Sequence, residues 1–548
     1  MSRRLPFVLF ASAAALVAVS LANVTGVRAA QSAQPPDPAA QFRTSQRCLV
    51  CHNNLKSSEG KDASIAAEWQ ASVMANAARD PYWQGSVRRE VHDHPQASAA
   101  IQNQCATCHM PLAHLQDNAA HQQTGVFALL PLTVQNPHTA AAADGVTCTV
   151  CHQIQPAGLG TAAAANGNFS VAAPDLQPRP LFGPFAAPAD RVLKIHTLAS
   201  GYTLVQSSVI RQAALCASCH TLYTTAYGPG GKPIGRLPEQ MTYLEWQHSS
   251  FQGRQTCQQC HMPAVQGTVA IASLLSQPYK GVRRHTFVGA NFLLENILSA
   301  HHDELAVAAS PAQLAAAAAD TTAFLQSQAA RLTVSPAQFS HGRLTFAVRV
   351  ENLSGHKLPT AFPSRRAWLH VTITDAAGHA VFESGRLNPD GSIAGNANDQ
   401  DPTRYSPHYA TITAPDQVEI FEPILGDSQG RVTTGVLNAT QYLKDNRILP
   451  AGFDKATAGP DIAVHGKAAG DPNFTAGSAT TKYRVSTGSA AGPFTISAQL
   501  LYQPIGYRWA HNLAAYKADE PQSFVRDFEQ AAAHSAVVLA HASSEAGK

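Results

Sequence analysis

The sequence predicts an α+β multidomain fold: a mainly helical, loop-rich region, then a β-sandwich-like domain and a C-terminal helix. Three observations support this prediction. The chain has 548 residues, which is enough for two or three domains with substantial cores. All ten cysteines lie in five similar motifs before residue 262. From residue 331 onward, apolar and polar residues alternate as they do in half-buried strands.

Residues 1–29 have the pattern of a cleaved secretory signal peptide. Arg3 and Arg4 precede an apolar stretch, and Val27 and Ala29 place small residues at the two positions that determine cleavage. An uncleaved membrane anchor is the alternative, although the stretch is short and Ala-rich for a span of about 20 residues. Residues 30–45, rich in Ala, Gln and Pro, should form a flexible arm. The protein is therefore expected in the periplasm or otherwise exported, with association at the cell surface or membrane surface left open.

The five cysteine motifs share the form C-x-x-C-H. Their spacing along the chain is 41 to 68 residues, too short for five separate domains, so we expect one domain over residues 46–300. The cysteine pairs are Cys48/Cys51, Cys105/Cys108, Cys148/Cys151, Cys216/Cys219 and Cys257/Cys260, and the histidines are His52, His109, His152, His220 and His261.

This motif is the attachment signature of c-type haem. Two thiols bind the two vinyl groups of the porphyrin, and the imidazole of the next residue ligates the iron. The alternatives are disulfides, which an exported protein favours, and zinc sites. Zinc ribbons use cysteine pairs in twos and need no histidine after each pair, so a fifth pair would be left over. The sequence therefore predicts five c-type haems, close enough to contact one another.

Each haem iron also needs a distal ligand or an open side. Three histidines are the leading candidates: His285 lies in a segment with few helix signals, His356 in a tight loop between strands, and His196 after an apolar stretch. Met74 lies at helical spacing with Trp69, so it is either a core methionine or the distal ligand of the first haem. Further candidates are His114 and His138.

The rest of the chain predicts a helical connector over residues 301–330, with Pro311 beginning its second helix. Alternating apolar residues around Phe346, Val371 and Ile496 predict antiparallel strands and a β-sandwich-like domain over residues 331–515. Residues 391–480 should be long loops with short strands. Residues 516–548 should form an amphipathic helix that continues through Val538.

The chain resembles bacterial multihaem cytochromes c of the cytochrome c-552/c-554-like class. That class includes the tetrahaem cytochromes of nitrification and, more distantly, pentahaem nitrite reductase, whose lysine-ligated catalytic haem has no counterpart in these motifs. The resemblance implies haem binding and electron transfer but identifies no substrate. The segments that carry it are 68–83, 105–111, 144–154, 215–224, 238–251, 256–263, 283–292, 352–378 and 502–513.

Composition excludes a nucleic-acid-binding role. Charged residues are only 14 % of the chain, and without the three arginines of the leader 36 basic residues stand against 36 acidic ones. Haem propionates would make the loaded protein negative and favour a basic patch on a redox partner. We therefore expect an exported pentahaem electron-transfer protein with unidentified redox partners. The alternative is a multihaem oxidoreductase that acts on a small nitrogen or sulfur compound at one open haem.

Overall fold

The computed structural model describes residues 42–132, 137–172 and 178–547, with the side chains of residues 137 and 138 left out. The described residues from 42 onward belong to one compact unit. The expected signal peptide and most of the expected arm therefore lie outside the described residues, as do the side chain of His138 and its expected role. In the described part of the chain, no helix is both long and apolar enough to cross a bilayer.

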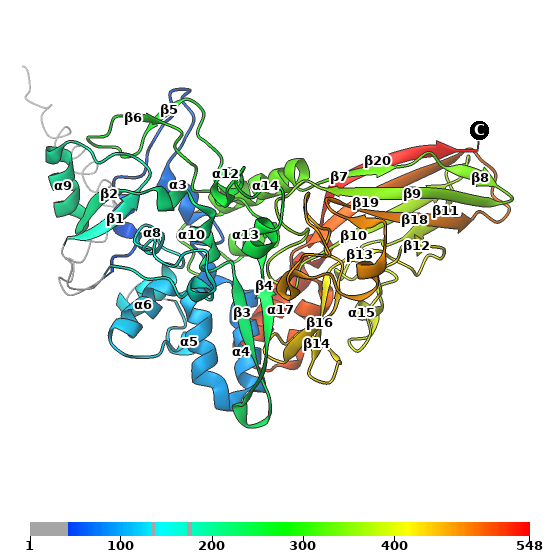
Figure 1. Ribbon diagram of the computed structural model, residues 1–548, viewed down its shortest axis with the longest axis horizontal. Helices are drawn as coiled ribbons and strands as arrows, with labels where there is room; N and C mark the ends of the chain where they lie inside the picture. The colour runs from blue at the N-terminus through cyan, green and yellow to red at the C-terminus, as the bar shows by residue number, and fades with distance from the viewer. Residues whose placement is uncertain (1–41, 133–136, 173–177, 548) are drawn as a thin grey trace, which may run out of the picture. The chain divides into compact units, whose positions relative to one another are not determined.

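The region before residue 301 consists of short helices joined by loops (Figure 1). Its helices are α2 (Gln46–Leu49), α3 (Ile65–Gln70), α4 (Pro81–Asp93), α5 (Ser98–His109), α6 (Pro111–Ala119), α7 (Pro137–Ala143), α8 (Cys148–Cys151), α9 (Asp190–Ser200), α10 (Ala213–Ala217), α11 (Thr242–Gln247), α12 (Cys257–His261) and α13 (Phe292–Ala300).

Local sequence explains where the longer helices begin. Asp80 caps α4 by accepting hydrogen bonds from the main-chain N–H groups of Tyr82 and Trp83, and Pro81 occupies the first turn. The expected helix at Pro311 is confirmed as α14 (Pro311–Gln328), which begins with a capping box formed by Ser310 and Gln313.

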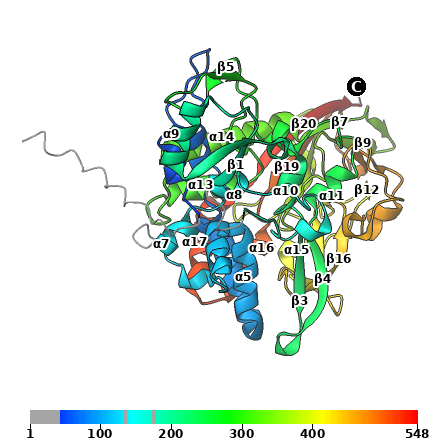
Figure 2. The same ribbon diagram turned by 60° about the vertical axis from the view of Figure 1, so that its left-hand side comes forward.

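Three small two-stranded sheets lie among these helices. Strand β1 (Arg179–Gly183) pairs in parallel with β2 (Tyr202–Gln206), and β5 (Thr268–Ala270) pairs with β6 (Pro278–Lys280). The hairpin of β3 (Leu222–Tyr227) and β4 (Pro233–Gln240) lies beside α5 (Figures 1 and 2). There the Gln104 side chain donates a hydrogen bond to the carbonyl of Tyr223.

Two larger sheets follow α14, so the expected change to strands is confirmed. The first has the order β12-β18-β9-β7, with β8 and β17 as additions, and the second has the order β11-β10-β19-β20, with β13 added. The bounds are β7 (Ala330–Val334), β8 (Gln338–Ser340), β9 (Arg343–Asn352), β10 (Arg366–Thr374), β11 (Ala380–Ser384), β12 (Thr411–Ile412), β13 (Ile420–Phe421), β17 (Phe474–Thr475), β18 (Ser478–Ser486), β19 (Phe494–Gln503) and β20 (Val537–Ala546).

The alternating residues of the two sheets face a shared core. Phe346 and Val348 of β9 and Val371 of β10 are buried in one apolar cluster, which also takes in Ile496 of β19 and Phe292 of α13. The sheets therefore pack face to face and extend their core to the helical region. Residues 391–480 contain short strands between long connections, as expected. Among them are α15 (Ala397–Gln400), β14 (Pro423–Asp427), β15 (Val432–Thr433) and β16 (Ala439–Asp445).

The C-terminal segment differs from the expectation of one long helix. After α16 (Tyr507–His511), helix α17 (Asp519–Ala531) ends before the apolar residues that were expected to continue it. Residues from Val537 onward form β20, which pairs antiparallel with β19. The two adjacent β-branched residues Val537 and Val538 favour a strand, and the open edge of β19 supplies its hydrogen-bonding partner.

Candidate functional site

The five C-x-x-C-H motifs lie next to one another although 41 to 68 residues separate consecutive motifs in the sequence. The first, third, fourth and fifth motifs begin on the short helices α2, α8, α10 and α12, and the second motif forms the end of α5. All ten cysteines are free thiols. Hydrogen bonds between thiols of different motifs raise the pKa values of Cys48, beside Cys148, and of Cys216, beside Cys257.

Further thiol contacts make the fourth motif the centre of the group. A hydrogen bond to Cys108 raises the pKa of Cys219. The pKa of Cys151 is raised to about 12, first by burial and then by the nearby charge of Cys219. The third, second and fifth motifs therefore each border the fourth, and the first motif borders the third through Cys48. Five porphyrins attached at these positions would form one continuous group.

Four of the five motif histidines have their Nδ1 atoms within hydrogen-bonding distance of main-chain carbonyls. The distances are 2.5 Å from His52 to Ile271, 3.1 Å from His109 to Ala77, 2.6 Å from His152 to Phe182 and 2.6 Å from His261 to Val288. A carbonyl can only accept, so each Nδ1 carries the proton and Nε2 keeps its lone pair for a metal. Burial lowers the pKa values of all four imidazoles, which keeps them neutral at pH 7.

His285 faces His152 in an arrangement that fits two ligands of one metal. The ring centres are 6.5 Å apart and the ring planes differ by 14°. Metal–imidazole bonds of about 2 Å, with rings of about 1 Å radius, give roughly 6 Å for two imidazoles on opposite sides of one ion. The Nδ1 of His285 donates to the carbonyl of Arg283 at 3.1 Å, and burial followed by the charge of His152 lowers its pKa to about 3.

His356 has the same relation to His261. Their ring centres lie 6.3 Å apart with planes 12° from parallel. His356 stands in the loop between β9 and β10, and its Nδ1 donates to the carbonyl of Lys357 at 2.9 Å. Burial, together with the nearby charge of His261, lowers its pKa to about 4. The strand region thus supplies an imidazole to a motif of the helical region.

His196 lies on α9, near the first motif. Its Nδ1 is 3.3 Å from the carbonyl of Tyr202, and its pKa is lowered by burial and by the nearby charge of His52. The structure therefore brings each of the three predicted distal histidines close to a different motif histidine. Whether they bind iron stays a prediction.

Met74 lies in turns that follow α3, outside the helix in which we expected it. Its carbonyl accepts a hydrogen bond from the N–H of Val146, two residues before the third motif. Its main chain is thus beside the third motif, and its role as ligand of the first haem stays a prediction. His114 makes side-chain contacts through both ring nitrogens, with Thr124 at Nδ1 and with Asn118 at Nε2. That leaves neither nitrogen unengaged for a metal.

His109 and His220 have other surroundings. The ring of His109 stacks on Trp83, with centres 4.5 Å apart and planes 3° from parallel. His220 has its pKa lowered to about 4 by burial and by the charges of His261 and Arg365. Arg365 also acts on Tyr502: burial raises the pKa of Tyr502 to about 12 against the charge of Arg365, and the Tyr502 hydroxyl is buried without a hydrogen-bond partner among the described atoms.

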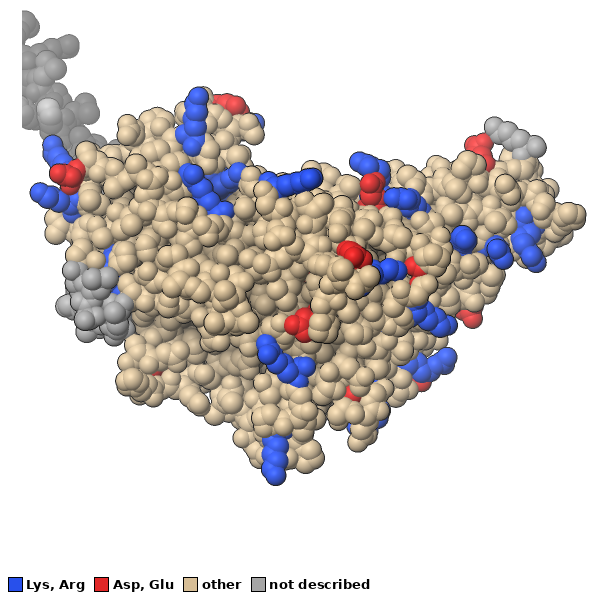
Figure 3. All heavy atoms as spheres, viewed as in Figure 1, with Lys and Arg blue, Asp and Glu red and all other residues tan. Residues whose placement is uncertain are grey.

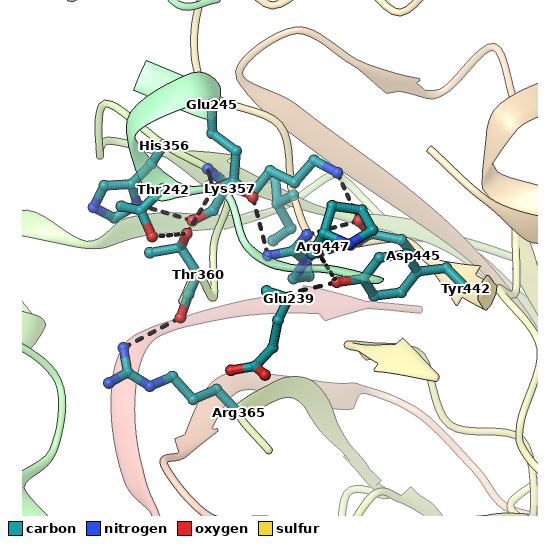
Figure 4. A network of polar contacts seen from close by, with 12 residues as sticks. Glu239, Thr242, Glu245, His356, Lys357, Thr360, Arg365, Tyr442, Asp445 and Arg447 are labelled. Atoms are coloured by element: carbon teal, nitrogen blue, oxygen red, sulfur yellow. Dashed lines mark hydrogen bonds and ion pairs between the residues drawn. The ribbon is translucent and has the colours of Figure 1, made fainter. Parts of the chain in front are cut away.

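A buried network of charges holds the His356 loop, as Figure 4 shows. One carboxylate oxygen of Glu245 accepts hydrogen bonds from the N–H of Lys357 at 3.2 Å and the hydroxyl of Thr360 at 2.5 Å. Its other oxygen lies 3.0 Å from the guanidinium of Arg447. Asp445 then binds both Arg447, at 2.7 Å, and Lys357, at 2.6 Å. Burial alone would raise the pKa of Asp445, but these two cations hold it well below its usual range.

Glu68 performs the equivalent task for His285. Its carboxylate accepts the main-chain N–H of His285 at 2.7 Å and also pairs with Arg284. Glu68 and Glu245 both begin a Glu-Trp-Gln triplet near the end of a short helix, α3 and α11 respectively. This repeated triplet is visible in the sequence, although its position in the sequence gives no sign of what the glutamates bind.

Comparison with known proteins agrees with this fold. No protein-family model and no curated protein sequence matches the chain. Among solved structures, it is similar to a penta-heme cytochrome c552 from Thermochromatium tepidum, with a TM-score of 0.50 and 16 % sequence identity over 93 % of this chain and 100 % of that one. At a coarse level, the chain therefore has the fold of a multihaem c-type cytochrome.

Proposed function

We propose that this protein binds five c-type haems and transfers electrons among them. The observation that carries the proposal is the pairing of His152 with His285 and of His261 with His356 at separations that fit one metal between each pair. Disulfides or structural zinc would give no reason for nearly parallel imidazoles from distant parts of the chain. The expected motifs and the fold of the penta-heme neighbour support the same assignment.

Different residues would attach the haems to the chain and ligate their irons. The ten motif cysteines would form the thioether bonds, and the five motif histidines would be the proximal ligands. His285, His356 and His196 would be distal ligands at the third, fifth and first motifs. When bound, each haem supplies one iron that is oxidised or reduced by one electron. The carbonyls that accept from Nδ1 fix ring orientation and keep each Nε2 aimed at the iron.

The contacts between motifs support an electron path. The first motif borders the third, and the third borders the fourth through Cys151 and Cys219. The fourth also borders the second and the fifth. Electrons that enter at the first motif would reach a junction at the fourth. We also propose that the chain is exported after cleavage near Ala29, which N-terminal sequencing of the mature protein would test.

A multihaem oxidoreductase is the second candidate, favoured by the surroundings of His220. In the described part of the chain, no second imidazole is seen paired with His220 as His285 is with His152. The charge of Arg365 lowers the pKa of His220, and the same guanidinium acts on Tyr502, whose hydroxyl is unpartnered among the described atoms. A cation beside an open iron could bind a small oxyanion and stabilise its negative charge.

Spectroscopy of the purified protein separates these proposals. A pyridine haemochrome assay and intact mass should give five covalently bound haems, and a mass equal to the amino acids alone would refute haem binding. Electron paramagnetic resonance counts low-spin and high-spin haems. His285→Ala and His356→Ala should each convert one low-spin haem to high spin, whereas His541→Ala, at an exposed position on β20, should convert none. A high-spin haem that responds to nitrite or cyanide would favour the enzyme.

A further inference from the structure

Exposed apolar side chains gather around the first motif. In the described residues, six of the eight large hydrophobic side chains that are exposed lie on three segments, 46–52, 190–206 and 268–281. We call these segments the first-motif face. The six residues are Val50, Ile195, Leu198, Val205, Leu274 and Leu275.

Hydrogen bonds join the three segments into one surface. Arg47 donates from its guanidinium to the carbonyl of Ala199 at 2.9 Å, which ties the first motif to α9. The N–H of Ser273 donates to the carbonyl of Cys51 at 2.7 Å, and His52 donates to Ile271. The loop with the two exposed leucines therefore lies directly against the motif.

One equivalent position is exposed to solvent in the first motif and buried in the third. The residue before the second cysteine is valine in both, but Val50 is 76 % exposed and Val150 only 2 %. Leu198, on the helix that carries His196, is 87 % exposed. Single exposed apolar residues are ordinary on protein surfaces, but a group of six around one site indicates an interaction surface.

The charges of this face are mostly positive. Its three segments contain Arg47, Arg191, Lys194 and Lys280 against the single acid Asp190. Figure 3 shows more Lys and Arg than Asp and Glu over the region of α9, β5 and β6. The near-zero balance of the whole chain therefore conceals a local excess of cations, and a carboxylate-bearing partner complements it.

We propose that the first-motif face docks a redox protein whose contact surface is apolar at its centre and ringed by carboxylates, so that electrons are exchanged at the first haem. This inference rests on the proposed electron-transfer function. An apolar centre excludes water where the two redox groups meet, and complementary charges speed the encounter while leaving the complex short-lived. The expectation of a basic partner, based on net charge, is replaced here by an acidic one.

Binding is measured first, with both proteins oxidised so that no electron moves. The probe is a small acidic blue-copper protein, and a basic monohaem cytochrome c of similar potential is the opposite probe. The acidic probe should bind and should weaken steeply with added salt. The double variant Arg191→Glu with Lys194→Glu should bind it about tenfold less tightly, because it reverses two rim charges. Lys482→Glu, exposed on β18, is the matched control and should bind normally.

Kinetics and an apolar variant complete the test. When the reduced protein meets the oxidised probe, one electron leaves a haem and reduces Cu(II) to Cu(I). The double variant should slow this second-order reaction for the acidic probe and speed it for the basic one. Leu198→Gln should slow it as well, whereas Ile234→Gln, at an exposed position on β4, should not. Equal rates with both probes in the wild type and the double variant would overturn the proposal.

Other occupants give different results. A second copy would appear as a dimer that Leu198→Gln dissociates, and an anionic membrane would appear as vesicle binding that Arg191→Glu with Lys194→Glu abolishes. If residues 30–41 cover the face, their deletion should increase both probes' rates equally. Any of these three outcomes would overturn the assignment to a redox protein. Haem content and spin-state counts of each variant report separately on the proposed function, because a protein without haem would fail there first.

Discussion

Replacing Glu245 by Gln tests how the structure holds its fifth motif. The Glu245 side chain is fully buried, and it accepts hydrogen bonds from Lys357 and Thr360 while pairing with Arg447 at 3.0 Å. Glutamine keeps one acceptor oxygen but turns its NH₂ group toward either the guanidinium or the loop. Loss of one partner from a buried ion pair costs about 3–5 kcal/mol, because the remaining charge stays buried and unpaired.

Two variants calibrate that cost. Glu351→Gln removes a surface pair with Arg331, in which the glutamate side chain is 40 % exposed, and should cost less than about 1 kcal/mol. Glu68→Gln disturbs the equivalent triplet at His285, where the Glu68 side chain is 12 % exposed and its Arg284 partner 29 %, so an intermediate loss is expected. Urea unfolding midpoints followed by tryptophan fluorescence give the order of the three.

The local effect of Glu245→Gln is read from the haem. Glu245 holds the N–H of Lys357, and the carbonyl of Lys357 orients His356. Weakened ligation at the fifth motif should therefore appear as one haem of altered spin state or potential, while Glu68→Gln should alter a different haem. If Glu245→Gln unfolds at the same urea concentration as Glu351→Gln and leaves every haem unchanged, the buried network does not position His356.

Three further predictions concern stability. His408 lies between two buried carboxylates that raise its pKa although burial opposes the charge. Its stabilising effect should therefore be full at pH 5.5 and fade above neutrality, so the melting temperature should fall as the pH rises. His408→Gln should reduce this fall in melting temperature. Burial raises the pKa of Glu90 to about 7, so its ionisation should cost stability between pH 5 and 8, and Glu90→Gln should reduce the loss over that range. Gly145→Ala should sharply reduce the yield of soluble, haem-loaded protein, because φ is +57° there and a Cβ would lie 2.5 and 2.7 Å from main-chain oxygens. Gly60→Ala is the control and should reduce the yield much less, because Gly60 also has a positive φ but open space around it. A flat pH profile of wild-type melting, or equal yields of the two alanine variants, would contradict these expectations.

The sequence predicted the parts of the structure that local pattern determines. Alternation around Phe346 and Val371 located the strands, and Pro311 marked the start of α14. The apolar residues from Val537 onward were assigned to a helix because periodicity over a few residues cannot distinguish a helix end from an edge strand. Their pairing with β19 depends on an open sheet edge, which is a tertiary property.

The candidate site likewise contains residues that the sequence identifies and residues that only the folded structure identifies. The cysteines and His261 can be identified from the sequence because covalent attachment of a haem needs a fixed spacing. His356 carries no such signal, since its partner lies 95 residues away in sequence and only folding brings the two rings together. The contribution of Glu245 was hidden for the same reason, although the repetition of its triplet at Glu68 was a clue in the sequence itself.

The strand region therefore has a definite part in the site. It supplies His356 from the loop between β9 and β10, and it fixes that loop with Asp445, the last residue of β16, and Arg447 just after it. Its core also includes Phe292 of α13, so the strand region and the helical region share one apolar core. Replacing His356 by Gly in the full chain would keep all five motifs and the shared core but remove the imidazole opposite His261. The variant should therefore contain five haems, with the fifth converted to high spin, and a low-spin fifth haem in it would show that another residue is its ligand.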